Sequence, residues 1–290
     1  MPLIMSLVTG KRRIHTHKGS FLRDLAHESR LLDLLVIVLV PVVLAGVYSL
    51  PRTTLEAWVF DTTAPTLATA YTSHFVHLES LHLLGNLSVY LPAVLVAYLL
   101  CVMSDRRKLF RITFVTLLVA FPFALSAMQL VFPRERLIFG FSGINAGFVG
   151  LAAFALVGYL GVNLSRRINE RYAPALLFFG AGAIALIALP ARGFRIEVGL
   201  AAITLGLIYV GIALFRQGVP SREEIRAAAD NPGYFELAGA GFGLLVGYPF
   251  AAFQDAVVPG GGVVDVYVHV LGFSLAFIVV FAFVFAVDSG

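Results

Sequence analysis

Charged residues and cysteine are both scarce in this sequence of 290 residues. Only 13% of its residues are charged, whereas 59% are hydrophobic and the mean hydropathy is +0.89. Because soluble globular domains carry about 25% charged residues, this composition excludes that class and predicts an all-α polytopic membrane protein. The single cysteine, Cys101, rules out an intrachain disulfide. The net charge of +4 arises from short basic clusters between apolar runs, a distribution that does not indicate nucleic-acid binding.

Two kinds of intramembrane protease chemistry are excluded by missing residues. Zinc proteases need H-E-x-x-H, and His27 with its following glutamate lacks the second histidine. Aspartyl catalysis needs two aspartates within the spans, whereas Asp255 and Asp265 fall in a predicted external loop. We therefore expect neither a metal nor a cofactor. The histidines that come closest to a metal-binding set are His74, His77 and His82.

A basic tail over residues 1–30 precedes eight apolar runs in residues 31–290, each near the roughly 20 residues that a spanning helix needs. We expect the tail to lie in the cytoplasm against anionic lipid headgroups and the remainder to form one transmembrane domain. The predicted spans are Leu31–Leu50, Leu78–Met103, Ile112–Phe132, Ser142–Leu164, Pro174–Leu189, Val198–Phe215, Leu237–Phe253 and Val266–Val287.

The distribution of lysine and arginine predicts the orientation of these spans. With eight spans, 16 of the 21 basic residues fall on the side of the tail and 5 on the other side. Because cytoplasmic loops carry the excess of Lys and Arg, both termini are predicted to be cytoplasmic. A prokaryotic plasma membrane fits this topology, as does an organelle membrane. The long external segment Pro51–His77 contains Trp58 and is expected to lie at the membrane interface.

Polar side chains within the spans are few, and four of them fall at one depth. In the predicted topology Ser142 opens the fourth span and His269 lies near the start of the eighth. His82 and Asn86 lie in the outer half of the second span. Each residue alone is more typical of helix packing, but serine hydrolysis requires a nucleophile, a base and oxyanion donors at one place. The other two polar residues in the spans are Gln129 and Asn145.

Glycines surround Ser142 on both sides. Gly140 and Gly143 form a G-x-S-G with the serine, which frees the backbone around a nucleophile. Gly143 and Gly147 form a G-x-x-x-G, which lets a neighbouring helix approach closely. The stretch 137–151 therefore predicts a tight turn followed by a closely packed helix.

Three motifs, in this order, resemble the rhomboid family of intramembrane serine proteases over roughly Thr66 to Val287. The second-helix motif is His82-Leu83-Leu84-Gly85-Asn86, preceded by His74 and His77; the nucleophile motif is Gly140-Phe141-Ser142-Gly143; and the last-helix motif is His269-Val270-Leu271-Gly272 with Ala276.

The resemblance implies a rhomboid-like helical bundle with a catalytic dyad of Ser142 and His269 and no acid. Ser142 would attack the scissile carbonyl while His269 takes up and returns the proton. His82, Asn86 and the Ser142 N–H would stabilise the oxyanion. Gly272 would face the glycines of the serine helix. The expected substrates are single-span membrane proteins, cut near the outer boundary of the bilayer without a cofactor.

Three features depart from the family pattern. Trp58 is followed by Val59, where the family has a tryptophan–arginine pair. Ala146 stands where an aromatic residue often supports the catalytic histidine. The 127 positions from Ser142 to His269 contain three apolar runs, where the six-span core has one. We therefore expect an added helical hairpin, which preserves the direction of the histidine helix.

Two other functions are compatible with parts of the sequence. A catalytically silent relative would bind transmembrane clients, but the retention of Ser142, His269 and the oxyanion pair argues against it. A small-solute transporter of eight helices would need charged residues within its spans for coupling, and almost none are present.

Overall fold

The computed structural model describes residues 21–131, 136–188, 195–253, 257–258, 262–263 and 266–288. Within these ranges seven helices are long and apolar enough to cross a membrane, or eight if one bent pair counts as a single span. The chain is therefore a multi-pass helical membrane protein, as its composition predicted. Part of the basic tail and the aspartates Asp255 and Asp265 lie outside the described residues.

The long helices follow the predicted spans closely. They are α3 (Leu31–Tyr48), α6 (Ser80–Val102), α7 (Arg107–Val119) with α8 (Phe121–Val131), α9 (Ser142–Asn163), α10 (Pro174–Ala188), α11 (Arg195–Gln217), α13 (Tyr234–Phe253) and α14 (Val266–Asp288). The shorter elements are α2 (Phe21–Glu28), α4 (Arg52–Ala57), β1 (Phe60–Asp61), α5 (Leu67–Thr72), η1 (Ser73–Phe75), β2 (Leu137–Ile138), η2 (Glu170–Tyr172), α12 (Arg222–Ala229), β3 (Val257–Val258) and β4 (Gly262–Val263).

The third predicted span, Ile112–Phe132, is not one continuous helix. Two helices, α7 and α8, meet at Ala120 and are bent by 51°. Pro122 is the cause, because its ring lacks an N–H and would clash with the carbonyl of Leu118 in a continuous helix. In the structure Pro122 instead stands in the first turn of α8, where proline is tolerated.

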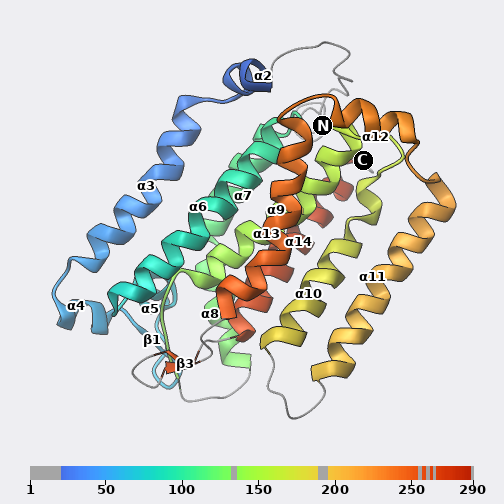
Figure 1. The fold of residues 1–290 in the computed structure, drawn as a ribbon. Coiled ribbons are helices and arrows are strands. Elements are labelled where there is room, and N and C mark those ends of the chain that lie inside the picture. Colours follow the sequence, from blue (N-terminus) through green and yellow to red (C-terminus); the bar gives the residue numbers. More distant parts are fainter. Residues whose placement is uncertain are drawn as a thin grey trace.

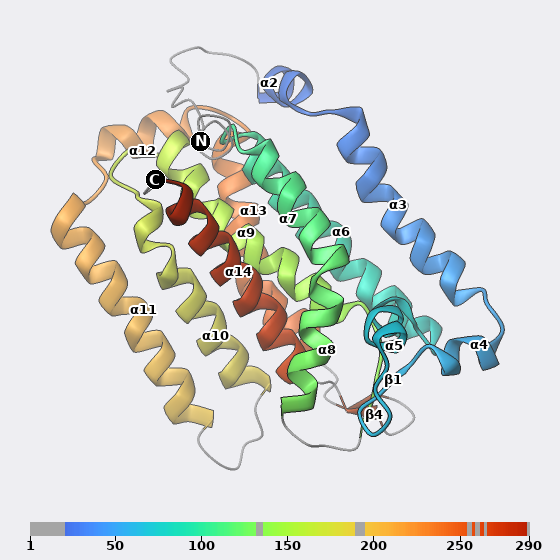
Figure 2. The same cartoon turned by 180° about the vertical axis from the view of Figure 1, so that it is seen from behind.

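Helix α9 is the centre of the bundle. It contacts α6, α7, α8, α10, α13 and α14, and its most apolar stretch is entirely buried (Figures 1 and 2). The closest approach is to α14, where a β-carbon on Gly150 would collide with the carbonyl oxygen of Phe273. A β-carbon on Gly272 would likewise collide with the carbonyl oxygen of Gly143. Small residues thus let the two backbones touch, which is how helices associate where lipid supplies no hydrophobic driving force.

The predicted extra spans form an antiparallel pair of helices. Helix α10 packs against both α13 and α14, and α11 packs along α10 at the periphery (Figure 1). Gly180 on α10 leaves room for the ring of Phe273, because a β-carbon there would lie 2.8 Å from Cε1. Gly182 and Gly199 bring α10 and α11 together in the same way. Since the pair returns the chain to the end where it began, α14 runs in the same direction as α9.

The two ends of the bundle differ in character. Helices α2 and α12 and the carboxyl end of α14 lie at one end, whereas α4, α5, β1 and β2 lie at the other (Figures 1 and 2). At the first end, Ser221 caps α12 in a reciprocal box with Glu224. Tyr234 there accepts a bond from Tyr159 at 2.7 Å through its carbonyl and donates to Asp24 at 2.7 Å. Which end faces the cytoplasm stays a prediction from the charge distribution.

We expect Gly150→Ala to destabilise the bundle, because the added methyl group must push Phe273 and α14 away from α9. Overpacking of this kind costs about 1–3 kcal/mol. Gly243→Ala on α13 is the matched control, since a β-carbon there meets nothing within 4 Å. Thermal unfolding in detergent should show a lower midpoint for Gly150→Ala only, and equal midpoints for the two variants would contradict the close α9–α14 contact.

Candidate active site

Ser142 is the first residue of α9, directly after a tight turn. Gly140 has φ +110, a conformation that side-chain-bearing residues rarely adopt. Strand β2, just before the turn, pairs with β1, so the segment that follows α3 is joined to the residues that lead into the serine turn. Ser142 itself is half-buried. The prediction of a tight turn before a closely packed helix is confirmed.

His82 lies over this turn. A β-carbon on Gly140 would lie 2.7 Å from Cε1 and 2.8 Å from Nε2 of His82, so glycine is required for space as well as for its backbone angle. The His82 ring also packs edge-on against His77 and Phe139, with ring centroids 4.9 Å and 5.7 Å away. The structure thus brings His82 to the backbone two residues before Ser142.

His269 is buried in the first turn of α14 and only 6% exposed. Both ends of the helical turn that carries it touch Gly143. A β-carbon on Gly143 would lie 2.5 Å from Cγ1 of Val268, and Gly272 packs on the carbonyl oxygen of Gly143. Because Val268 and Gly272 flank His269 on α14 and Gly143 follows Ser142 on α9, the two predicted dyad residues lie on directly apposed turns.

Phe253, which the sequence analysis did not single out, packs against His269. The two rings are edge-on, with centroids 5.0 Å apart and an interplanar angle of 67°. Phe253 is the last residue of α13 and is buried. The one signal in the sequence was an aromatic residue at the end of the helix that precedes the histidine helix. Because apolar spans contain many aromatic residues, this signal did not distinguish Phe253 from the others.

The same packing explains the small residue at position 146. A β-carbon on Gly272 would lie 3.1 Å from the β-carbon of Ala146, so α14 sits against α9 at this point. An aromatic ring on residue 146 would displace α14. The ring that contacts His269 is that of Phe253, which comes from a different helix, α13.

Asn86 takes part in a buried amide network. Asn145 donates from Nδ2 to the carbonyl oxygen of Asn86 at 2.9 Å and to its Oδ1 at 3.1 Å. Asn86 donates from its own Nδ2 to the carbonyl oxygen of His82 at 3.1 Å. This network ties α9 to α6 one turn below Ser142. The bond to the His82 carbonyl uses one of the two N–H donors of the Asn86 amide.

Residues 73–77, in the segment before α6, form hydrogen bonds to the turn that precedes Ser142. The carbonyl of Ser73 accepts from the Gly140 N–H at 2.9 Å, and Nε2 of His77 accepts from the Phe141 N–H at 3.4 Å. Nε2 of His74 lies 3.0 Å from the hydroxyl oxygen of Ser126 on α8. The serine turn is therefore anchored to this segment through the backbone N–H groups of Gly140 and Phe141, and His74 joins the same segment to α8.

The two histidines of this segment are neutral near pH 7. Burial lowers the pKa of His74 to about 4. Burial, and to a smaller extent the nearby His82, lowers the pKa of His77 to about 3. A neutral ring is what allows Nε2 of His77 to accept the Phe141 N–H, because a protonated imidazole has no acceptor nitrogen.

Comparisons with known proteins find no match: no protein-family model fits this chain, and no curated protein or solved structure is significantly similar to it. Among the described residues, no group of three or more His, Cys, Asp or Glu side chains could hold a metal ion.

We expect the folded state to lose stability as the pH falls below about 6.5, the ordinary histidine value. The folded-state pKa values of His74 and His77 lie below that of the unfolded chain, so acid protonates the unfolded state first. Stability is thus fully present above pH 6.5 and is lost as the pH falls toward 4, by up to about 3 kcal/mol for His74 alone.

Unfolding midpoints measured from pH 7.5 to 4.5 test this expectation. A His74→Gln and His77→Gln double variant serves as the reference, because it removes both titrating groups. Its midpoint should depend less steeply on pH than that of the native chain, whatever its stability at pH 7.5. Parallel pH curves for the two proteins would show that neither histidine is held neutral by the fold.

Proposed function

We propose that this protein is an intramembrane serine endopeptidase of the rhomboid type. The observation that supports it most directly is the contact of Gly143 with both Val268 and Gly272, which apposes the turns that carry Ser142 and His269. A half-buried serine, a buried histidine with a ring packed against it, and a second histidine at the serine turn are the groups that serine hydrolysis needs.

In the proposed mechanism Ser142 attacks the scissile carbonyl and His269 acts on its proton. His269 takes the proton from the Ser142 hydroxyl during attack and returns it to the leaving amine. The edge-on contact with Phe253 would limit the rotation of the imidazole and so help to orient it for this proton transfer.

The oxyanion would form at the start of α9. The first N–H groups of a helix have no partner within the helix and lie at the positive end of its dipole, so Ser142 and Gly143 offer donors there. His82 lies over the same turn and adds a side-chain donor. In other proteases one such donor contributes about 3 kcal/mol to barrier lowering. Asn86 would contribute by holding His82 in place through its backbone carbonyl.

The arrangement of the helices is compatible with a six-span protease core plus an added hairpin. The core would comprise α3, α6, the bent pair α7–α8, α9, α13 and α14, and the hairpin would be α10–α11. Because the hairpin contains two spans, the start of α14 reaches the same end of the bundle as the start of α9. With the basic tail in the cytoplasm of a plasma-membrane protein, this end faces outward, where single-span substrates would be cut.

Labelling with a fluorophosphonate, which modifies activated serines, tests the dyad. We expect the native chain to react, and both Ser142→Ala and His269→Ala to lose the label, because the serine is a weak nucleophile without its base. Loss of either dyad member should also reduce the cleavage of a single-span model substrate by at least about 10³-fold.

The matched controls are Ser88→Ala and Ser274→Ala, which remove hydroxyls from α6 and α14 without touching the proposed dyad. Both should retain full labelling and cleavage. Complete processing of the substrate by Ser142→Ala would contradict the protease proposal. Absence of labelling in several detergents and in bilayers, with the fold intact, would instead identify a catalytically silent protein that binds transmembrane clients.

We expect Phe253→Ala to lower kcat by about tenfold, because an aromatic contact of this kind is worth roughly 0.5–1.5 kcal/mol and each 1.4 kcal/mol is a factor of ten. KM should stay close to the native value if the ring orients His269 and does not bind substrate. Phe253→Tyr should recover most of the rate. Phe250→Ala, an exposed ring one turn earlier on α13, is the control, and an equal loss in both variants would contradict the orienting role.

A further inference from the structure

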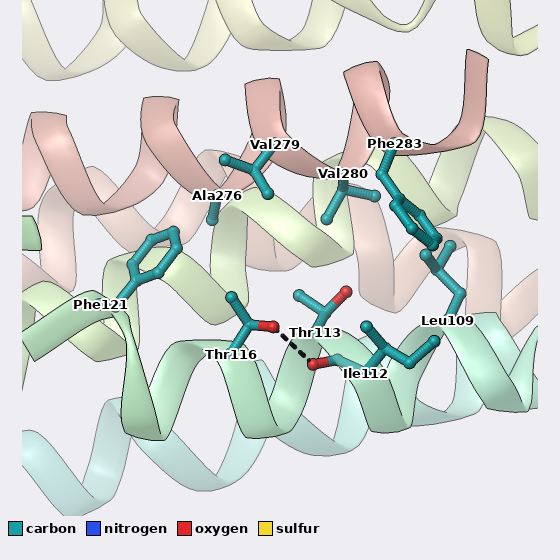
Figure 3. A pocket seen from close by; sticks show the side chains of 9 residues that line it. All are labelled: Leu109, Ile112, Thr113, Thr116, Phe121, Ala276, Val279, Val280 and Phe283. Carbon is teal, nitrogen blue, oxygen red and sulfur yellow. Dashed lines mark hydrogen bonds between the residues drawn. The ribbon is translucent and has the colours of Figure 1, made fainter. Parts of the chain in front are cut away.

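An apolar groove separates α7 from α14 on the outer surface of the bundle (Figure 3). Its floor is buried: Leu109, Phe121 and Val280 are each no more than 3% exposed. Its rims are open, since Ile112 and Val279 are 40% and 41% exposed. The remaining lining residues are Thr113, Thr116, Ala276 and Phe283. In a protein that spans a membrane, this groove faces lipid.

The two threonines do not make the groove polar. Thr116 donates its hydroxyl to the carbonyl oxygen of Ile112 at 2.8 Å, as Figure 3 shows, so this hydroxyl is satisfied within its own helix. Apart from Thr113, the other side chains that line the groove are hydrocarbon. A ligand of the groove is therefore expected to be a hydrocarbon chain and not a polar solute.

A cation stands at one end of the groove. Lys108 precedes Ile112 and Thr116 by one and two helical turns, so the three share one stripe of α7. Lys108 is exposed, and it has no hydrogen bond or ion pair with any described residue. Its basic neighbours are engaged elsewhere: Arg107 donates to the carbonyl of Glu28 at 2.5 Å, and Arg111 pairs with Asp33 at 2.7 Å.

The length of the groove matches one leaflet. From Lys108 to Val119 the helix α7 rises about 16 Å, which is close to half of the roughly 30 Å hydrocarbon core of a bilayer. The start of α7, which carries Lys108, lies at the same end of the bundle as α2 and α12 (Figure 2), and Arg107 there donates to the carbonyl of Glu28. A phospholipid of the leaflet at that end would place its phosphate at Lys108 and one acyl chain along the groove.

We propose that the groove between α7 and α14 binds an anionic phospholipid. The charge of Lys108 selects the anionic headgroup, and the apolar lining selects the acyl chain. The bound chain fills the space between two helices that both pack on α9, and it braces α14 against α7. On α14 the groove begins at Ala276, about two helical turns from His269, and its lining contains neither residue of the proposed dyad, so it can be tested independently of proteolysis.

Native mass spectrometry of the full chain in detergent tests the proposal. The protein is titrated with phosphatidylglycerol or with phosphatidylcholine of the same acyl chains, and the lipid retained per molecule is measured. We expect at least a threefold preference for phosphatidylglycerol. Lys108→Glu should remove the preference, and Val279→Trp, which fills the groove, should lower the retention of both lipids.

Two variants control for charge and for bulk. Arg216→Glu removes an exposed cation at the end of the distant helix α11. Ile278→Trp adds the same ring at the residue of α14 that precedes Val279 and does not line the groove. Both should keep the native preference. Equal retention of the two lipids by the native chain, or an unchanged preference in Lys108→Glu, would overturn the proposal. Lys108 is exposed, so its variant is informative even if Val279→Trp is unstable.

Discussion

The contact between the backbones of α9 and α14 is the constraint on which the rest of the structure depends. In a bilayer the helices gain little from the hydrophobic effect when they associate, so their stability comes from packing and from interhelical hydrogen bonds. Gly143, Gly150 and Gly272 remove the side chains that would hold the helices apart. The first of these follows Ser142, so the same contact that stabilises the bundle also positions the serine against the turn that carries His269.

Such close packing limits which residues can support the histidine. Ala146 has to be small because α14 lies directly against it, and the ring that contacts His269 is Phe253 from α13. The orientation of His269 therefore depends on the position of α13, and α13 is packed in turn against α6, α9 and α10. The α10–α11 hairpin is thus more than a peripheral addition, because α10 contacts both helices whose ends meet at the proposed site.

The end of the bundle that carries the serine turn is held by polar groups, in contrast to the apolar middle. The serine turn is tied to Ser73 and His77 through its backbone N–H groups, and Asn86 and Asn145 join α6 to α9 just below it. Neutral, buried histidines suit this environment because a charge there would be costly to desolvate. At the opposite end, Arg111 forms an ion pair with Asp33 and Arg106 with Glu170, while Lys108 is exposed.

The sequence by itself determined the class of protein and most of the boundaries of the long helices, because a helix that spans a membrane must be apolar and about 20 residues long. It also placed Ser142 at the start of a helix and His269 near the start of another. Two features were decided only by tertiary structure: the contact of Phe253 with His269, and the bonds from the Asn145 amide on α9 to Asn86 on α6. Each depends on which faces of distant helices meet. Hydropathy, which is nearly uniform around a spanning helix, carries little information about that choice.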